Sequence, residues 1–527
     1  MPQIPSSAEA PLPSDLKKKI EEAQRFYETG DYKAAISIYN ELLLTQPPAV
    51  IIYNNLGNIY FSAKKIPEAI SCYKQALALN NQESEVHFNL GNVYLESKDL
   101  KNARNCFLES NRLDPENIDV LNNLGNIYNL EGKKEKAENI YQKILSLDSS
   151  HIGAYNNLAV LSFEKEDYGA AKDYYLKALE IEPNYAEARF NLGNTLEQLG
   201  QPQAALEQFQ RVLKYTPDFY PAQKNMAILL DKQGEKEKAV KEYDRCLTLQ
   251  PEDASILCYL GALYSRELLF NPAIQLFERA IKSAPEFYLS YLLYGNALRD
   301  KGNFKEATQN YKKCIENKND CLPAYLELGK IMIKLGLVKQ AIKICEKALK
   351  YFSENSTLLN LLATAHLNAR NIDDAISIYQ QAVRMHPEDA SLYNNLGNIF
   401  LDRGDLNKAH EYYQKSIGLD PHNDKGHYNL GLVLVELNRV PAAIEVFKKV
   451  IELKPKHAPA HYNLACLHAR TQQAIPALEC LKTAIQSGFY DVEYILKDED
   501  LVSLREMTEF KKIVAHIDPL QKSSPDQ

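Results

Sequence analysis

The residues best suited to metal chemistry in this 527-residue sequence are three histidines and a cysteine near its end. His457, His461, Cys466 and His468 lie close together, and imidazole and thiolate are ligands that Zn²⁺ prefers. His461 and His468 are seven residues apart on a predicted helix, so they share a face but are too widely spaced for one ion. Equivalent positions elsewhere carry aromatic residues such as Tyr53. We therefore interpret these histidines as structural substitutes and predict no metal site, with zinc as the alternative.

Motifs for catalysis are missing from the sequence. It has no glycine-rich phosphate loop, no dinucleotide fingerprint, no Gly-x-Ser-x-Gly and no His-Glu-x-x-His. The nearest approach is His410-Glu-Tyr-Tyr-Gln, which lacks the second histidine. We predict that the chain is not an enzyme and needs no cofactor.

A column of asparagines offers a different chemistry, the hydrogen bonding of a carboxamide. A carboxamide donates and accepts, which suits it to a peptide N–H and C=O. Asparagine is a weak helix former, and several repeats lack it, so the fold does not demand it at this position. We predict a ladder that holds an extended peptide, formed by Asn55, Asn89, Asn123, Asn157, Asn191, Asn225, Asn395, Asn429 and Asn463. The alternative is that duplication copied these asparagines without a use.

The asparagine column is interrupted in the middle of the chain by larger and mostly apolar residues. We predict that they form an apolar patch in the same groove, made of Tyr259, Leu292, Leu293, Leu326 and Leu361. The alternative is that these side chains pack locally.

The elements that position these columns follow from a 34-residue period, counted here from Leu16 as position 1 of the first repeat. Alanine holds position 20 in all fourteen repeats, from Ala35 to Ala477, and position 8 holds only glycine or alanine. Position 24 holds Tyr or Phe except at Cys345 and Leu481. Small residues allow two antiparallel helices to approach closely, and the aromatic rings fill the remaining core.

Turn signals complete the unit. Glycine at position 15, as in Gly30, predicts the left-handed end of the first helix, and proline at position 32, as in Pro47, ends the second. Asn117, Asp253 and Asp389 stand where a helix N-cap is expected.

These patterns, seen in Tyr53-Asn-Asn-Leu-Gly-Asn-Ile-Tyr60, resemble the tetratricopeptide repeat family. The resemblance implies an all-α fold: an α-solenoid, a right-handed superhelix of fourteen helix-turn-helix repeats whose first helices line a concave groove. The asparagine column resembles the ladder in the repeat superhelix of O-linked N-acetylglucosamine transferase, without that enzyme's catalytic half. Residues 15–491 are the expected repeats.

A closing segment is expected over residues 492–516, because an array needs its last apolar face covered. Leu501, Leu504, Phe510 and Ile513 are the residues expected to cover it. Residues 1–14 and 517–527, rich in Pro, Ser and Gln, are expected to be disordered.

Composition limits the partners. The net charge of −8 provides no basic field for nucleic acid, and no apolar run is long enough to cross a bilayer. Nine cysteines without a paired framework, and a start without a leader pattern, favour a cytoplasmic protein. We expect a scaffold that binds other proteins through extended segments or helices, or alternatively a targeting subunit of a separately encoded enzyme such as a glycosyltransferase.

Overall fold

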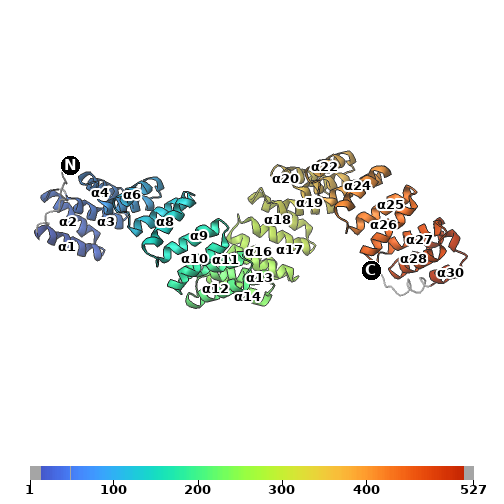
Figure 1. Ribbon diagram of the computed structural model, residues 1–527, viewed down its shortest axis with the longest axis horizontal. Helices are drawn as coiled ribbons and strands as arrows, with labels where there is room; N and C mark the ends of the chain where they lie inside the picture. Colours follow the sequence, from blue (N-terminus) through green and yellow to red (C-terminus); the bar gives the residue numbers. More distant parts are fainter. Residues whose placement is uncertain (1–13, 48, 516–527) are drawn as a thin grey trace. The chain divides into compact units, whose positions relative to one another are not determined.

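The computed structural model describes residues 14–47 and 49–515, and in this range the helices pair into fourteen hairpins. The tails expected to be disordered fall almost entirely outside the described residues. The chain divides into two compact units, Met1–Pro251 and Glu252–Gln527, each of which is a stack of seven hairpins (Figure 1). The predicted all-α solenoid of helix-turn-helix repeats is thereby confirmed.

The first unit contains seven pairs of helices: α1 (Ser14–Glu28), α2 (Tyr32–Thr45), α3 (Val50–Ser62), α4 (Ile66–Leu79), α5 (Ser84–Glu96), α6 (Leu100–Leu113), α7 (Ile118–Leu130), α8 (Lys134–Leu147), α9 (Ile152–Glu164), α10 (Tyr168–Ile181), α11 (Ala186–Gln198), α12 (Pro202–Tyr215), α13 (Tyr220–Lys232) and α14 (Lys236–Leu249).

The second unit contains seven further pairs: α15 (Ala254–Arg266), α16 (Phe270–Ser283), α17 (Tyr288–Asp300), α18 (Phe304–Asn317), α19 (Leu322–Lys334), α20 (Val338–Leu349), α21 (Ser356–Asn368), α22 (Ile372–Met385), α23 (Ala390–Asp402), α24 (Leu406–Leu419), α25 (Asp424–Glu436), α26 (Val440–Leu453), α27 (Ala458–Arg470) and α28 (Ala474–Gln486). Three short elements follow: α29 (Val492–Lys497), the 3₁₀ helix η1 (Glu499–Leu504) and α30 (Thr508–Ala515).

Eight of the hairpins are closed by an aromatic ring that lies against a glycine at position 8. A Cβ atom added to Gly57 would come within 2.6 Å of the Tyr73 ring, and one added to Gly193 within 2.5 Å of the Phe209 ring. Position 8 is small because the ring at position 24 occupies that space. Burying such a ring contributes about 1.5–3 kcal/mol, so these contacts are a main source of each hairpin's stability.

Every turn inside a hairpin has a left-handed residue at position 15. Seven of these are glycines, such as Gly302 with φ +88°, as the sequence predicted. The other seven are not glycine, and they reach φ between 54° and 63°: Lys64, Lys98, Glu166, Leu268, Arg370, Asn438 and Gln472. The fold therefore requires this conformation even where the side chain disfavours it.

Helix starts match the predicted caps. The side chain of Asn117 accepts from the backbone N–H of Asp119 and Val120, and Asp389 accepts from that of Ser391. Asp253 also accepts from two backbone N–H groups at the start of α15. These three predicted N-caps are confirmed.

The last repeat is covered by the segment that follows it. Leu501, Leu504, Phe510 and Ile513 are all buried, in one cluster with side chains of α27 and α28. Asp498 begins η1 as its N-cap and accepts from the hydroxyl of Tyr462 on α27. The apolar end of the array is therefore not left open to water.

First helices of neighbouring repeats contact one another: α15 contacts α17, and α19 contacts α21. No comparable approach between second helices of neighbouring repeats is found in the described part of the chain. Within each unit the first helices therefore lie on the inner side of the stack, which is where the asparagine column lies.

Candidate functional site: the asparagine face of the first helices

The asparagines at position 6 are half-buried on the first helices, each beside the preceding repeat. Asn123 Nδ2 donates to Asn92 Oδ1 at 3.0 Å, and Asn225 Nδ2 donates to Asn194 Oδ1 at 2.7 Å. Donor and acceptor are 31 residues apart, so each bond crosses a boundary between repeats. The side chains at position 6 therefore help to join adjacent hairpins, which sequence reasoning did not anticipate.

In the fourth and twelfth repeats, the position-9 asparagine that accepts such a bond also accepts from the core tyrosine of its own repeat. Tyr141 Oη donates to Asn126 Oδ1 at 2.7 Å, and that oxygen also accepts from Asn157 Nδ2 at 3.3 Å. Asn398 Oδ1 likewise accepts from Tyr413 Oη at 2.7 Å and from Asn429 Nδ2 at 3.0 Å. A relay therefore runs from the core ring to the position-9 asparagine and on to the next repeat.

The relay has a readable sequence signal, because asparagine recurs at position 9 as well as position 6. The position-9 asparagines are Asn58, Asn92, Asn126, Asn194, Asn296 and Asn398. Where the fifth repeat has Val160 at this position, the side chain of Asn191 in the sixth has no hydrogen bond with any described residue. The two columns do not vary strictly together, because Asn55, Asn191, Asn395 and Asn463 follow repeats that lack asparagine at position 9.

Other members of the ladder bond to different groups of the preceding repeat. Asn55 Nδ2 donates to Tyr39 Oη at 3.0 Å, and Asn463 Nδ2 lies 3.4 Å from Tyr428 Oη. Two more donate to position-5 asparagines: Asn89 to Asn54 at 3.0 Å and Asn395 to Asn360 at 2.9 Å. All but Asn191 are therefore anchored.

Burial keeps the tyrosine hydroxyls of the relay protonated. It raises the pKa of Tyr141, and it raises the pKa of Tyr413 against a smaller opposite effect of the hydrogen bond with Asn429. The hydroxyls remain donors across the physiological range, so the relay does not change with pH there.

Each anchored carboxamide keeps unused hydrogen-bonding capacity. Seven of the eight donate to one acceptor in the preceding repeat, whereas Asn157 donates to both Asn122 and Asn126. No described residue donates to the Oδ1 of Asn89, Asn123 or Asn225. These asparagines are only half-buried, so a ligand on this face could reach the oxygen and the second N–H. The anchoring fixes the amide orientation before any ligand arrives.

The predicted apolar patch is smaller than expected. Leu292 and Leu361 are each 8% exposed and belong to the core of the second unit. Tyr259, Leu293 and Leu326 are half-buried. The expectation of five groove-facing side chains is therefore corrected to three.

The histidine group does not assemble a metal site in the described residues. His457 Nδ1 caps α27 by accepting from the N–H of Ala460, His461 Nε2 bonds to the carbonyl of Pro455, and His468 Nδ1 bonds to Gln473. Each ring is used locally, by a partner no more than six residues away along the chain.

Cys466 lies instead beside Asp498 and Asp500 of the closing segment, with their potential ligand atoms within 4.8 Å of one another. Asp498 Oδ2 already accepts from the Tyr462 hydroxyl and lies 3.5 Å from the Cys466 sulfur, and its Oδ1 accepts from the Asp500 N–H. The cluster is explained by its role in attaching the closing segment.

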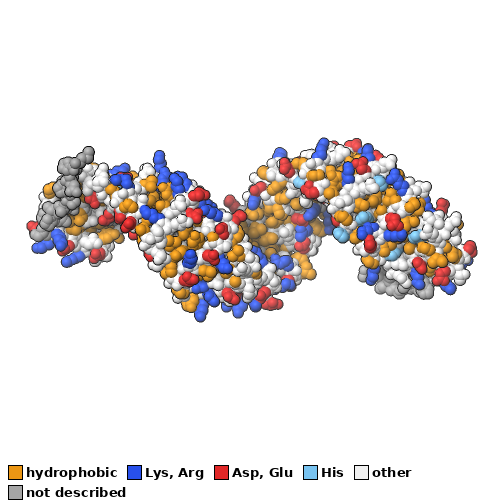
Figure 2. All heavy atoms as spheres, viewed as in Figure 1, with side chains coloured by type: hydrophobic (Ala, Val, Ile, Leu, Met, Phe, Trp, Pro, Cys, Tyr) orange, Lys and Arg blue, Asp and Glu red, His pale blue; other side chains and the backbone are white. Residues whose placement is uncertain are grey.

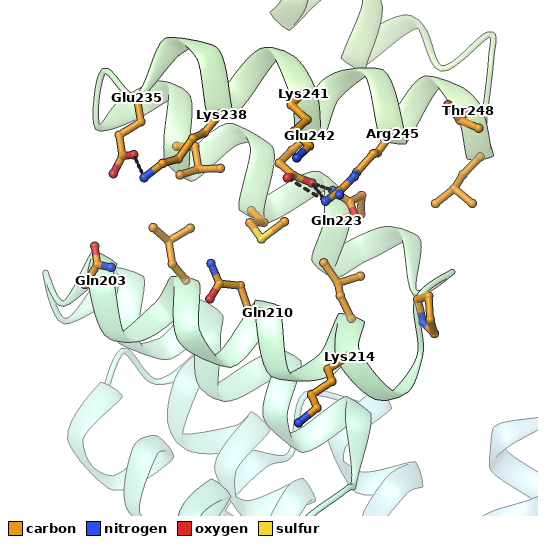
Figure 3. A pocket seen from close by; sticks show the side chains of 16 residues that line it. Gln203, Gln210, Lys214, Gln223, Glu235, Lys238, Lys241, Glu242, Arg245 and Thr248 are labelled. Carbon is orange, nitrogen blue, oxygen red and sulfur yellow. Dashed lines mark hydrogen bonds and ion pairs between the residues drawn. The ribbon is translucent and has the colours of Figure 1, made fainter.

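An outer cleft of about 800 Å³ lies between the second helices α12 and α14, over α13 (Figure 3). Its Glu242 carboxylate accepts from Gln223 Nε2 at 2.6 Å and from Arg245 at 2.8 Å. The cleft opens where positions 4 and 11 of the seventh repeat carry Gln223 and Leu230, while several other repeats have tyrosine there. Sequence reasoning missed this cleft, although the loss of both rings was visible.

On the face that Figure 2 displays, neither sign of charge gathers in a way that would select a single class of ligand. Figure 2 shows Lys and Arg side chains interspersed with Asp and Glu on the displayed face of each unit. Ion pairs such as Lys165–Glu138, at 2.6 Å, connect many of them.

A stack of helix hairpins with small, aromatic and asparagine columns is a helical-repeat scaffold. Tetratricopeptide repeat models match residues 57–98, 84–117, 106–139, 151–217, 190–254, 288–321, 322–355 and 360–424. The chain belongs to the tetratricopeptide repeat family, whose members are protein-interaction scaffolds.

A further family model, described as A/B hydrolase-like, N-terminal domain, matches residues 428–522. In the described part of that range the chain forms helices of the last two repeats and the closing segment. No curated protein sequence matches the chain. No helix in the described residues has the length and apolar character to cross a membrane.

Solved structures similar to the chain share helical folds at low identity. The APC/C hetero-tetramer Cut9–Hcn1 is 17% identical, with 84% of this chain and 95% of that chain covered and a TM-score of 0.36. Yeast Tom70 is 19% identical, with coverage of 90% and 96% and a TM-score of 0.36. PilF of Pseudomonas aeruginosa is 20% identical, with coverage of 39% and 94% and a TM-score of 0.35. At these scores the likenesses carry no functional argument.

Proposed function

We propose that this chain is a protein-interaction scaffold that holds an extended segment of a partner along the first-helix face of its repeats. The observation that carries the proposal is the anchored carboxamide. Asn89, Asn123 and Asn225 each use one N–H to bond the preceding repeat and retain an oxygen and a second N–H for a ligand backbone.

The ladder is longest in the first unit, where asparagine holds position 6 in six consecutive repeats, from Asn55 to Asn225. The second unit has a shorter run, from Asn395 to Asn463. Each run can bind a segment by itself, so the two units offer two places for a partner. A partner with two suitable segments would gain from binding both.

Magnitudes favour modest affinity at each run. A net hydrogen bond contributes about 0.5–1.5 kcal/mol, while ordering one peptide residue costs about 1–2 kcal/mol. The hydrogen bonds of the carboxamides alone therefore only offset the entropy cost of ordering the peptide. Side chains beside them must supply the remaining affinity and the sequence preference.

The test begins with a display library of random linear peptides selected on the intact protein. Binding of the selected peptides is then measured by fluorescence anisotropy against a variant carrying Asn123→Ala, Asn157→Ala and Asn191→Ala. Losing three such bonds should weaken binding by about 10- to 1000-fold. The matched control is Gln203→Ala with Gln210→Ala, which removes two exposed amides from the outer cleft and should leave binding unchanged.

Circular dichroism and denaturant unfolding of each variant separate a lost contact from a lost fold. Equal binding by the wild type and the triple asparagine variant, at equal stability, would exclude the ladder as the binding surface. A targeting subunit remains the alternative, and stable co-purification of one enzyme with the chain, insensitive to these substitutions, would favour it.

A further inference from the structure

Two cysteines lie in contact at the junction between the ninth and tenth repeats. Cys314 is on α18, and Cys321 is the N-cap residue of α19, seven residues later. The Cys314 thiol donates to the Cys321 sulfur, with the two Sγ atoms 3.5 Å apart. Both are free thiols; Cys314 is fully buried, whereas Cys321 is 4% exposed.

The position of Cys321 is unusual for its column. Position 34 is where several first helices receive a side-chain cap, as from Asn117, Asp253, Asn355 and Asn423. Cys321 makes no such cap bond. Ala49, Glu83, Tyr185, Phe219 and Phe287 at this position also lack a cap bond, but the ninth repeat alone has cysteine at both position 27 and position 34.

The surroundings make the two thiols unequal. The hydrogen bond from Cys314 lowers the pKa of Cys321, burial opposes this, and the nearby Lys318 ammonium lowers it further. The same hydrogen bond, together with burial, raises the pKa of Cys314. Cys321 is therefore the group that ionises, and it is also the more exposed of the two. Thiolates, rather than thiols, react with oxidants.

We propose that Cys314 and Cys321 form a modification site at which a hydroperoxide converts the two thiols into an intramolecular disulfide. The site takes a small oxidant because the pair is nearly closed to water. Lys318, whose ammonium lies 4.6 Å from the centre of the Tyr288 ring, stands near Cys321 as the local positive charge.

The reaction balances in two steps. The Cys321 thiolate attacks one oxygen of hydrogen peroxide, the O–O bond breaks, and hydroxide leaves and takes up a proton to become water. This produces a sulfenic acid on Cys321. The Cys314 sulfur then attacks the Cys321 sulfur, its proton goes to the departing hydroxide, and a second water is released. Two thiols are oxidised by two electrons, and one peroxide is reduced to two waters.

The disulfide would join the last turn of α18 to Cys321, the N-cap residue of α19. The only connection between these helices in the backbone is the short turn that includes Lys318, so the new bond closes a small loop across the repeat junction. The first turn of α19, which lacks a side-chain cap, would then be held covalently instead.

The experiment exposes the intact, reduced protein to one to ten equivalents of hydrogen peroxide, stops the reaction with acid, and alkylates the remaining thiols after unfolding. Trypsin separates the two cysteines, because Lys318 lies between them. We expect residues 314–318 linked to residues 319–330, a mass that disappears on treatment with dithiothreitol. Cys345, equally buried in the next repeat, is the internal control and should remain alkylated at the same doses.

Two variants assign the roles. Cys314→Ser should leave Cys321 as a sulfenic or sulfinic acid, and Cys321→Ser should leave Cys314 reduced. Hydrogen exchange at residues 321–325 should slow in the oxidised wild type and not in either variant. The proposal is overturned if both cysteines of the wild type stay alkylatable, if Cys345 oxidises first, or if Cys321 reaches sulfinic acid while Cys314 remains reduced.

Discussion

Leu361 lies directly against Gly329 of the preceding repeat: a Cβ atom on Gly329 would come within 2.8 Å of Leu361 Cδ2. In most repeats an aromatic ring at position 24 fills this space, but the tenth repeat has Cys345 there, 3.4 Å from the same point. Leu361, at position 6 of the next repeat, fills the volume that the small cysteine leaves. The asparagine column is interrupted here because the core needs the leucine.

This compensation predicts a coupled pair of substitutions. Leu361→Asn alone should destabilise the protein by about 2–5 kcal/mol, because it leaves a cavity and buries an amide. Cys345→Tyr alone should also destabilise the protein, because the tyrosine ring would clash with the Leu361 side chain. Together they recreate the pairing of Tyr39 with Asn55.

Denaturant unfolding of the four proteins in a double-mutant cycle measures this coupling. We expect the double variant to be more stable than the sum of the single changes by at least about 1 kcal/mol. Additive losses would contradict the compensation. Circular dichroism of each variant confirms that the helices are retained.

A left-handed leucine offers a stabilising substitution. Leu268 has φ +60° in the turn before α16, and its side chain is 73% exposed. The strain of the left-handed conformation is therefore not offset by burial of the side chain. Leu268→Gly should raise the free energy of unfolding by about 1 kcal/mol, because glycine adopts this conformation freely. Thermal unfolding of the wild type and of Leu268→Gly measures this gain in stability, with Leu269→Gly as the control.

Leu269 is the adjacent residue, with φ −85°. Leu269 is also the N-cap of α16, where glycine is tolerated, but glycine there relieves no left-handed strain, so the control should raise stability by less than Leu268→Gly does. Equal shifts in the two variants would show that the left-handed conformation costs nothing at this turn.

Removing one tyrosine hydroxyl tests the relay between repeats. Tyr141→Phe keeps the ring against Gly125 but removes the donor to Asn126 Oδ1. We expect a loss of about 0.5–1.5 kcal/mol in unfolding free energy, with unchanged helicity. Phe107, which occupies the same position one repeat earlier, shows that the core accepts a ring without a hydroxyl.

Tyr141→Phe should change the affinity for a peptide less than it changes the free energy of unfolding. The hydroxyl does not lie among the groups proposed to contact a peptide, so peptide affinity of Tyr141→Phe should stay within about threefold of wild type. A large loss of affinity would mean that the relay, rather than the free carboxamide atoms, determines binding.

Acid should weaken the start of α27 through His457. Burial lowers the pKa of His457 from its usual 6.5, and the Lys454 charge lowers it further. Because the folded state binds the proton less readily than the unfolded state, stability is full above pH 6.5 and falls as the pH drops below it. Protonating Nδ1 also removes the acceptor for the Ala460 N–H, a cap worth about 1 kcal/mol.

Unfolding at pH 7.5 and 5.5 measures this dependence, with His457→Asn as the comparison. Asparagine caps the corresponding helix in the preceding repeat, where Asn423 accepts from the N–H of Gly426. The variant should keep its stability at pH 7.5 and lose less of it at pH 5.5 than the wild type does. Identical pH dependence in both proteins would exclude His457 as a source.

The repeat architecture could be predicted from the sequence because its causes lie within one repeat. Ala35 and its equivalents, the aromatic column and caps such as Asn117 each act on neighbours within the same hairpin or at its ends. The relay was harder to predict, because Asn123 and Asn92 meet only through the packing of one hairpin on the next. Leu361 was misassigned for the same reason: its partner is Gly329 of the preceding repeat.

The direction of the relay bonds bears on how the chain folds during synthesis. In each one, the amide of the newer repeat donates to a group in the repeat made before it, as Asn225 does to Asn194. A repeat leaving the ribosome therefore finds the acceptor for its position-6 amide already in place. Synthesis can add finished hairpins one after another, and only the last of them depends on the closing segment that emerges after it.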